Sequence, residues 1–188
     1  MKFFYALLLF TLIGLIGSAA FANTTLQQKA IEALRVAHDE PNGSVYEHGG
    51  MLVENNGSLR YIEPHPDNDQ PDGVIALDRR ALLTGDRVVG TYHTHPCMVG
   101  YYHAYFSVPD VVIAIFSAVP SFMLDECDGS VHEFFTLVDK VHETGDDVEV
   151  RGEHCEKRYV HLPTGRIVGN IGVSDPPHEN GAKTDCPS

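Results

Sequence analysis

Two histidines in the segment GTYHTHP, residues 90–96, have a spacing that suits metal binding. Residues 87–95 are rich in β-branched and aromatic side chains, which favours a β-strand. Side chains two positions apart on a strand point to the same side, so His93 and His95 would present two imidazoles together. Two imidazole nitrogens are two of the ligands that a zinc site needs. The alternative is a pair of exposed strand histidines that binds no metal.

A third ligand is expected from Asp110, near the start of a predicted helix over residues 107–119 that we expect to be mostly buried. Ser107 is a suitable N-cap, and Pro109 is tolerated in the first turn. At the N3 position, the carboxylate of Asp110 would face back toward the end of the histidine-bearing strand. Ser-x-x-Asp alone is a common capping pattern, but its place soon after His-x-His-Pro favours a shared site. The proton of the Ser107 hydroxyl would remain free to stabilise an oxyanion.

A hydrolytic zinc site also needs a base for its water, and Glu47 is the expected base. It precedes Gly49 and Gly50, which would let another backbone approach closely beside the site. Glu54 and Glu63 are the alternatives. We expect Glu54 to be solvated at a hairpin turn, and Glu63 adjoins a polar loop.

Aromatic side chains are frequent in the segment PCMVGYYHAYF, residues 96–106, which joins the predicted strand to the predicted helix. We expect Tyr101, Tyr102 and Tyr105 to line a substrate-binding groove, although aromatic residues that cover the edge of the core would give the same pattern. His103 could be an additional ligand or a proton carrier.

The first 22 residues are typical of a secretory signal peptide, with cleavage expected after Ala22. Lys2 gives a basic start, residues 3–16 are almost wholly apolar, and residues 20–22 form an A-x-A cleavage site. A transmembrane anchor is the alternative, but the apolar run is short for a bilayer span. We therefore expect a periplasmic or secreted protein with no membrane anchor after cleavage.

The sequence contains four cysteines, and export would allow up to two disulfide bonds between them. The candidates are Cys97, Cys127, Cys155 and Cys186. We expect Cys97 to pair with Cys127 or Cys155 and so to fix the loop after the histidine pair. The alternative is that Cys97 is a fourth zinc ligand, which would silence an enzyme.

The chain is acidic, with a formal net charge of −13. Cleavage after Ala22 removes Lys2 and no acidic residue, which takes the charge from −13 to −14. Nucleic acid and anionic membrane surfaces are therefore unexpected partners, because phosphate binding needs a basic face. A neutral or cationic peptide or protein substrate fits the charge better.

Several predicted elements must bring these residues together. Residues 24–38 have helical spacing of apolar side chains. Residues 44–54 and 58–63 are typical of two strands joined by an Asn-Asn-Gly turn at 55–57. Further short strands are expected after residue 120. We expect an α/β fold in which a mixed, curved sheet is flanked by two helices and followed by a β-rich C-terminal extension.

The domain organisation is expected to be simple. The signal peptide at 1–22 is followed by one metallohydrolase domain over residues 23–172 and a flexible tail over 173–188. The tail is polar and rich in proline, a composition that gives little apolar surface to bury.

Three motifs in this order resemble the JAMM (MPN-type) zinc metalloprotease family. They are Glu-x-Gly-Gly-x-Leu at 47–52, His-Thr-His-Pro at 93–96 and Ser-x-x-Asp at 107–110. The resemblance covers roughly residues 28–138 and implies a JAMM-like (cytidine-deaminase-like) fold. It also implies Zn²⁺ bound by His93, His95 and Asp110, with Glu47 as general acid/base and Ser107 as oxyanion donor.

The resemblance further implies hydrolysis of an amide bond, because the family cleaves peptide bonds and isopeptide bonds on ubiquitin-like proteins. We expect an exported zinc peptidase or isopeptidase that uses a metal-activated water, and cell-wall peptide is a reasonable substrate. Two departures are a longer segment at 96–106 and export, since family members that act on ubiquitin work inside cells. The alternative is a catalytically inactive secreted binding, toxin or inhibitor protein with the same fold.

Overall fold

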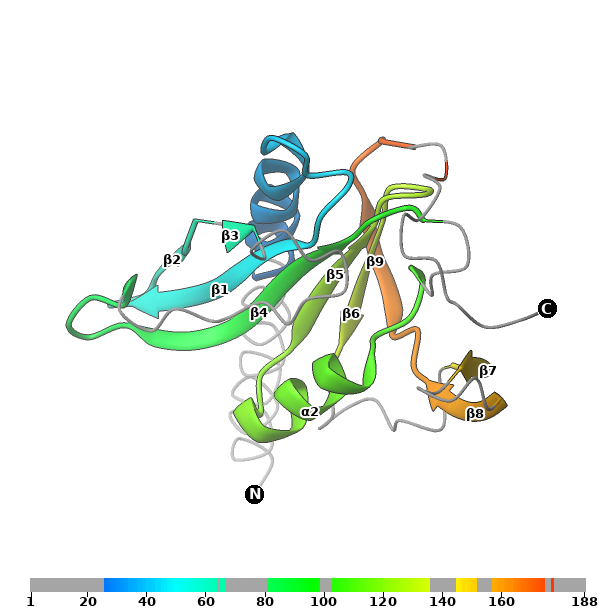
Figure 1. Cartoon of the computed structure of the whole chain (residues 1–188). Helices are drawn as coiled ribbons and strands as arrows, with labels where there is room; N and C mark the ends of the chain where they lie inside the picture. Colours follow the sequence, from blue (N-terminus) through cyan, green and yellow to red (C-terminus); the bar gives the residue numbers. More distant parts are fainter. Residues whose placement is uncertain are drawn as a thin grey trace, which may run out of the picture.

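A computed structural model describes residues 26–63, 65–66, 81–98, 103–135, 145–151, 157–174 and 177. It contains a large mixed β-sheet with a helix on each face, and a separate two-stranded sheet (Figure 1). The α/β class expected from the sequence is confirmed. The predicted signal peptide and most of the predicted tail lie outside the described residues. Within the described part, no helix is both long and apolar enough to cross a membrane.

The large sheet has the strand order β2-β1-β4-β5-β6-β9, and β3 also pairs with β1. Its strands are β1 (His48–Asn55), β2 (Ser58–Tyr61), β3 (His65–Pro66), β4 (Arg87–His95), β5 (Ser121–Asp125), β6 (Ser130–Phe134) and β9 (Arg166–Asn170). Among the described strands of this sheet, only β4 and β5 pair in parallel, and the other pairs are antiparallel. A parallel pair needs a crossover connection, and the helix α2 (Val108–Ser117) supplies it.

The β1–β2 hairpin forms as the Asn-Asn-Gly turn predicts. Asn56 and Gly57 have φ values of 51° and 80°, the left-handed pair of conformations that a two-residue type I′ turn requires. The first strand is shorter than expected, because it begins at His48 rather than at residue 44. The residues directly before it form turns instead.

The N-terminal helix, which includes residues 26–39, covers one face of the large sheet. Its apolar side chains, among them Ala33 and Leu34, form a buried cluster with Leu52, Tyr92 and Leu124 from three neighbouring strands. Helical spacing therefore predicted both the helix and the face that it buries.

The opposite face of the sheet is covered by α2, through a smaller cluster that contains Phe106, Ala114, Met123 and Phe134. The expectation of a mostly buried helix is wrong, because Ala114 is the only buried residue of α2. Phe116 is 86% exposed on the outer side. A uniformly apolar helix gives no periodic signal, so the sequence could not show that it packs through one side only.

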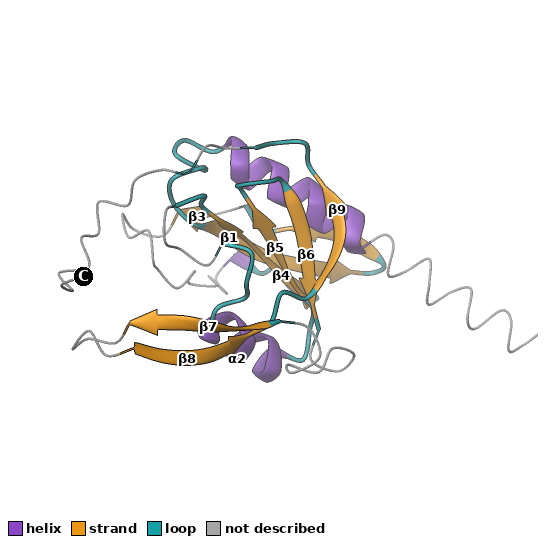
Figure 2. Ribbon diagram, turned by 90° about the vertical axis from the view of Figure 1, so that its right-hand side faces the viewer, coloured by secondary structure: helices purple, strands orange, loops and turns teal. Residues whose placement is uncertain are grey.

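The predicted β-rich extension is divided between two sheets. Strands β7 (Asp146–Arg151) and β8 (Lys157–Leu162) form the separate antiparallel pair shown in Figure 2. Strand β9, in contrast, returns to the large sheet and pairs with β6. The backbone N–H of Phe106 donates to the carbonyl of Pro163 at 2.9 Å, which ties the segment before α2 to the connection between β8 and β9.

Candidate metal centre

Strand β4 places the two motif histidines on the face of the sheet that α2 covers. His93 and His95 are separated by one residue, so their side chains share a side. Their Nε2 atoms lie 3.1 Å apart, and the two side chains are only 7% and 2% exposed. The rings of Phe106 and His93 also pack in a T-shaped arrangement, with centroids 6.2 Å apart. The pair is therefore held in a nearly closed environment.

The N-terminus of α2 brings Asp110 to the same place. Ser107 is the N-cap and Asp110 is the N3 residue of a capping box. One carboxylate oxygen, Oδ1, lies 3.4 Å from His93 Nε2, and the other, Oδ2, lies 3.6 Å from His95 Nε2. Burial raises the pKa of Asp110, but the adjacent imidazoles of His93 and His95 lower it by more, so the pKa is held well below its usual value. Asp110 is therefore an anion at neutral pH.

The three side chains have a spacing that fits one metal ion. One donor atom from each lies within 4.8 Å of the others. Bonds of about 2.0–2.2 Å in a tetrahedron separate neighbouring donors by about 3.3–3.6 Å. The two Nε2 atoms lie 3.1 Å apart, and they lie 3.4 and 3.6 Å from the two different carboxylate oxygens of Asp110, distances that are close to that range. His93, His95 and Asp110 could therefore hold a metal ion.

Glu47 also reaches this group, from the residue directly before β1. Gly49 pairs with His93 in the antiparallel β1–β4 register. Glu47, two residues before Gly49, therefore stands opposite His95, two residues after His93. Its Oε1 atom lies 3.8 Å from His95 Nε2, and its side chain is 9% exposed. Gly50 permits the close packing behind this segment, since a Cβ there would lie 2.8 Å from the carbonyl oxygen of Ile62.

The two alternative glutamates lie elsewhere. Glu54 is near the far end of β1, where it accepts hydrogen bonds from the backbone of Gly57 and from Arg87. We expected Glu54 to be solvated, but it forms an ion pair with Arg87 on the neighbouring strand β4. Glu63 is exposed. Of the three candidates, only Glu47 lies beside the histidine pair.

Ser107 lies beside the group but differs from expectation in its hydrogen bonding. Its hydroxyl donates to Asp110 Oδ2 at 2.6 Å, so its proton is not free. The backbone N–H of Ser107 donates to the same oxygen at 2.8 Å. The N3 carboxylate folds back onto the cap in this way because it accepts hydrogen bonds from both groups.

His103 is not part of the group of three. Its backbone carbonyl lies 3.1 Å from His95 Nδ1, and its ring Nδ1 lies 3.0 Å from both carboxylate oxygens of Asp125. Asp125 was not among the residues that we expected at the site. A usable signal existed, because a strand that follows a strand–helix unit often runs parallel to the first strand, which places Asp125 beside His95.

The remaining predicted residues divide into described and undescribed positions. Cys97 is bonded to Cys127, one of its two expected partners, so it offers no thiolate ligand. The hydroxyl of Tyr105 donates to Asp146 Oδ2 of β7 at 3.0 Å, which does not test a groove-lining role. Tyr101, Tyr102, Cys155 and Cys186 lie outside the described residues.

Comparison of the chain with protein-family models, with curated proteins and with solved structures gives no match. The functional inference therefore depends on the sequence motifs and on the geometry of the site.

Proposed function

We propose that this protein is an exported, zinc-dependent hydrolase of amide bonds with a JAMM-like fold and site. The observation that carries the proposal is the convergence of His93, His95 and Asp110, whose donor atoms come within 4.8 Å of one another from two separate elements. Two imidazoles and one carboxylate are a donor set that suits a catalytic zinc ion, since three protein ligands leave one position open.

The donor set favours zinc over the alkaline-earth ions. Mg²⁺ and Ca²⁺ prefer sites made only of oxygen ligands, and six or more of them. Imidazole nitrogens suit zinc and neighbouring transition metals. Bound here, Zn²⁺ would supply a Lewis acid that makes a water a better nucleophile and polarises the substrate carbonyl.

Glu47 is the residue best placed to move protons in this reaction. Its carboxylate oxygen lies 3.8 Å from His95 Nε2, so it borders the group of ligands without belonging to the closest three. In the proposed reaction Glu47 accepts a proton from the attacking water and then gives that proton to the leaving nitrogen. The products are a carboxylic acid and an amine, which balances the addition of one water.

Ser107 supports the charge that develops on the substrate carbonyl oxygen. Its hydroxyl donates to Asp110 in the structure and must turn toward the substrate to act as an oxyanion donor. Asp110 would keep a hydrogen bond from the backbone N–H of Ser107 during this rotation. This backbone hydrogen bond at the N-terminus of α2 is therefore kept when the Ser107 hydroxyl donates to the substrate.

Export and a peptide substrate are expected from the sequence, and two further observations are compatible with them. The Cys97–Cys127 disulfide fits an oxidising compartment. The negative charge disfavours nucleic acid and suits neutral or cationic polypeptides. Cell-wall peptide is a substrate that combines amide bonds with an extracytoplasmic location.

The test compares Glu47→Gln with the wild type on a panel of peptides, isopeptide-linked peptides and purified cell wall. We expect the variant to keep its zinc and to lose about 10²-fold to 10⁴-fold in turnover, as expected when a general acid/base is removed. Glu54→Gln is the matched control, because it changes the same functional group at the far end of β1. Wild-type turnover by Glu47→Gln would contradict the assignment. A zinc-loaded wild type that cleaves nothing in the panel would favour the inactive binding protein.

A further inference from the structure

His95, one of the three proposed ligands, contacts a backbone carbonyl through the ring nitrogen that does not face the other two ligands. The Nδ1 atom of His95 lies 3.1 Å from the carbonyl oxygen of His103. A carbonyl oxygen only accepts hydrogen bonds, so Nδ1 must carry the proton in this contact. In the neutral imidazole the other ring nitrogen, Nε2, then keeps its lone pair, and it faces His93 and Asp110. Such a contact fixes both the tautomer and the orientation of a metal-binding imidazole.

The loop that carries this carbonyl is anchored to the sheet by a side-chain pair. His103 Nδ1 contacts both oxygens of Asp125, each at 3.0 Å. Asp125 is buried, with only 3% of its surface exposed, and it is the register partner of His95 at the parallel ends of β4 and β5. Its Oδ1 also accepts the backbone N–H of Cys127 at 2.8 Å.

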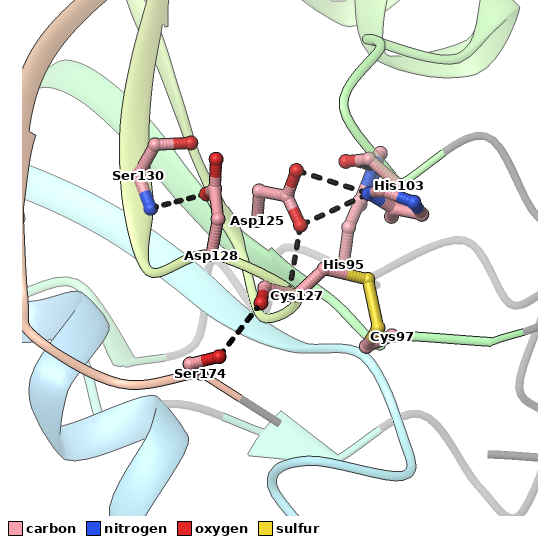
Figure 3. The surroundings of a disulfide bond; sticks show 8 residues. All are labelled: His95, Cys97, His103, Asp125, Cys127, Asp128, Ser130 and Ser174. Carbon is pink, nitrogen blue, oxygen red and sulfur yellow. Dashed lines mark hydrogen bonds and ion pairs between the residues drawn. A yellow bond between two sulfur atoms is a disulfide. The ribbon is translucent and has the colours of Figure 1, made fainter. Parts of the chain in front are cut away.

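The Cys97–Cys127 disulfide also links the ends of β4 and β5 covalently. Cys97 follows His95 by two residues, Cys127 follows Asp125 by two residues, and their sulfurs are bonded (Figure 3). The turn that holds Cys127 is itself fixed, because Ser174 Oγ donates to the Cys127 carbonyl at 3.3 Å. The ends of β4 and β5 are therefore cross-linked immediately behind His95.

We propose that His103, Asp125 and the Cys97–Cys127 disulfide act as one positioning unit for His95 and thereby set the metal affinity of the site. This inference rests on the metal centre proposed above. His103, Asp125 and Cys127 also form a second group of metal-type side chains. That group is not a second metal site in the oxidised chain, because the sulfur of Cys127 is bonded to Cys97.

The test uses two substitutions of the same residue. His103→Leu removes the contact with Asp125, whereas the side-chain amide of His103→Asn can still donate to it. We expect His103→Leu to bind zinc about 10-fold to 100-fold more weakly than the wild type, the loss usual for an outer partner of a metal ligand, and His103→Asn to recover most of that loss. His161→Leu is the matched control, because His161 Nδ1 contacts Asp147 at the same 3.0 Å in the separate sheet.

A second measurement does not depend on metal binding. Nitrogen NMR of the metal-free protein at about pH 8, above the ordinary histidine pKa, reports which ring nitrogen of His95 carries the proton. We expect the Nδ1–H form in the wild type, His103→Asn and His161→Leu, and a mixture in His103→Leu. An unchanged tautomer together with unchanged zinc affinity in His103→Leu would overturn the positioning unit and leave the metal centre intact.

The two proposals can fail separately. A wild type that binds no zinc would overturn the metal centre, while the tautomer of His95 would still decide whether His103 positions it. The disulfide is tested with Cys97→Ala/Cys127→Ala rather than with a reductant, because free thiols could bind zinc themselves. We expect weaker zinc binding in this double variant as well. Zinc affinity equal to the wild type in both His103→Leu and the double variant would contradict the inference.

Discussion

His48 is a buried titratable residue on the face of the sheet opposite the proposed metal centre. It shares that face with Leu52, which packs under the N-terminal helix. Only 1% of its surface is exposed, and neither ring nitrogen has a hydrogen-bond partner among the described residues. Burial lowers the pKa of His48, and the nearby Glu40 offsets this only in part. The folded protein therefore keeps this imidazole neutral.

This residue should make the metal-free protein sensitive to mild acid. Below the ordinary histidine pKa of about 6.5, the unfolded chain binds a proton at His48 that the folded chain binds less readily. The free energy of unfolding is therefore unaffected by His48 above that pH and falls as the pH drops below it, by at most about 1.4 kcal/mol per pH unit.

The measurement is chemical denaturation of the chelator-treated wild type and His48→Leu at about pH 7.5 and 5.5, on either side of that pKa. The variant should lose less stability between these two values than the wild type. Asp110 does not confuse the comparison, because its pKa lies well below the usual carboxyl value and it titrates at lower pH. Equal pH dependence in the two proteins would show that His48 is not a source of acid sensitivity.

At the scale of elements, the N-terminus of α2 combines a capping role with a proposed ligand role. The two roles can be separated, because the side chain of Asn at position 110 still accepts a hydrogen bond from Ser107 but carries no charge. Asp110→Asn should weaken zinc binding by more than the roughly 100-fold caused by losing an outer partner of a ligand. Its effect on the unfolding of the metal-free protein should be small.

Ser107→Ala is the complementary variant. It removes the N-cap side chain and should lower the free energy of unfolding by about 1 kcal/mol, while leaving zinc binding nearly unchanged. Calorimetric zinc titration and urea denaturation of both variants provide the comparison. Equal loss of zinc affinity in the two variants would mean that Asp110 acts through the helix cap and not as a ligand.

The parts of the site that depend on local pattern could be predicted from the sequence. Strand alternation gave the shared side of His93 and His95, and helix capping gave the direction of Asp110. Glu47 was harder, because its position opposite His95 depends on the pairing of two strands that are distant in the chain. The role of His103 depends on the path of a loop, which no local pattern encodes. The strand–helix–strand order favours the parallel pairing that involves Asp125, but it does not fix the register that places Asp125 beside His95.

The elements of the fold also divide into those that local patterns predict and those that depend on long-range packing. The Asn-Asn-Gly turn and the helical spacing near the N-terminus are local signals, and the hairpin and the first helix follow from them. The return of β9 to the large sheet is a long-range choice, as is the outward side of α2. Both are settled by packing in three dimensions, so the sequence alone left them open.

At the scale of the whole molecule, the Cys97–Cys127 disulfide should contribute a large part of the stability. It closes a loop with a sequence separation of 30 residues, for which the loss of chain entropy in the unfolded state corresponds to about 3–4 kcal/mol. Cys97→Ala/Cys127→Ala should therefore unfold at a clearly lower urea concentration than the wild type. A change below about 1 kcal/mol would mean that native contacts, rather than the cross-link, hold these strand ends together.

We propose that two histidines at the end of β4 and one aspartate at the start of α2 hold a single metal ion, and the hydrolase function depends on this ion. The most direct test is the zinc content of the purified protein, measured by mass spectrometry for the wild type, His93→Ala and the control His161→Ala. We expect one tightly bound zinc per chain in the wild type and the control, and loss of that zinc in His93→Ala. A wild type without zinc, or a His93→Ala variant that keeps it, would contradict the metal centre and the hydrolase proposed from it.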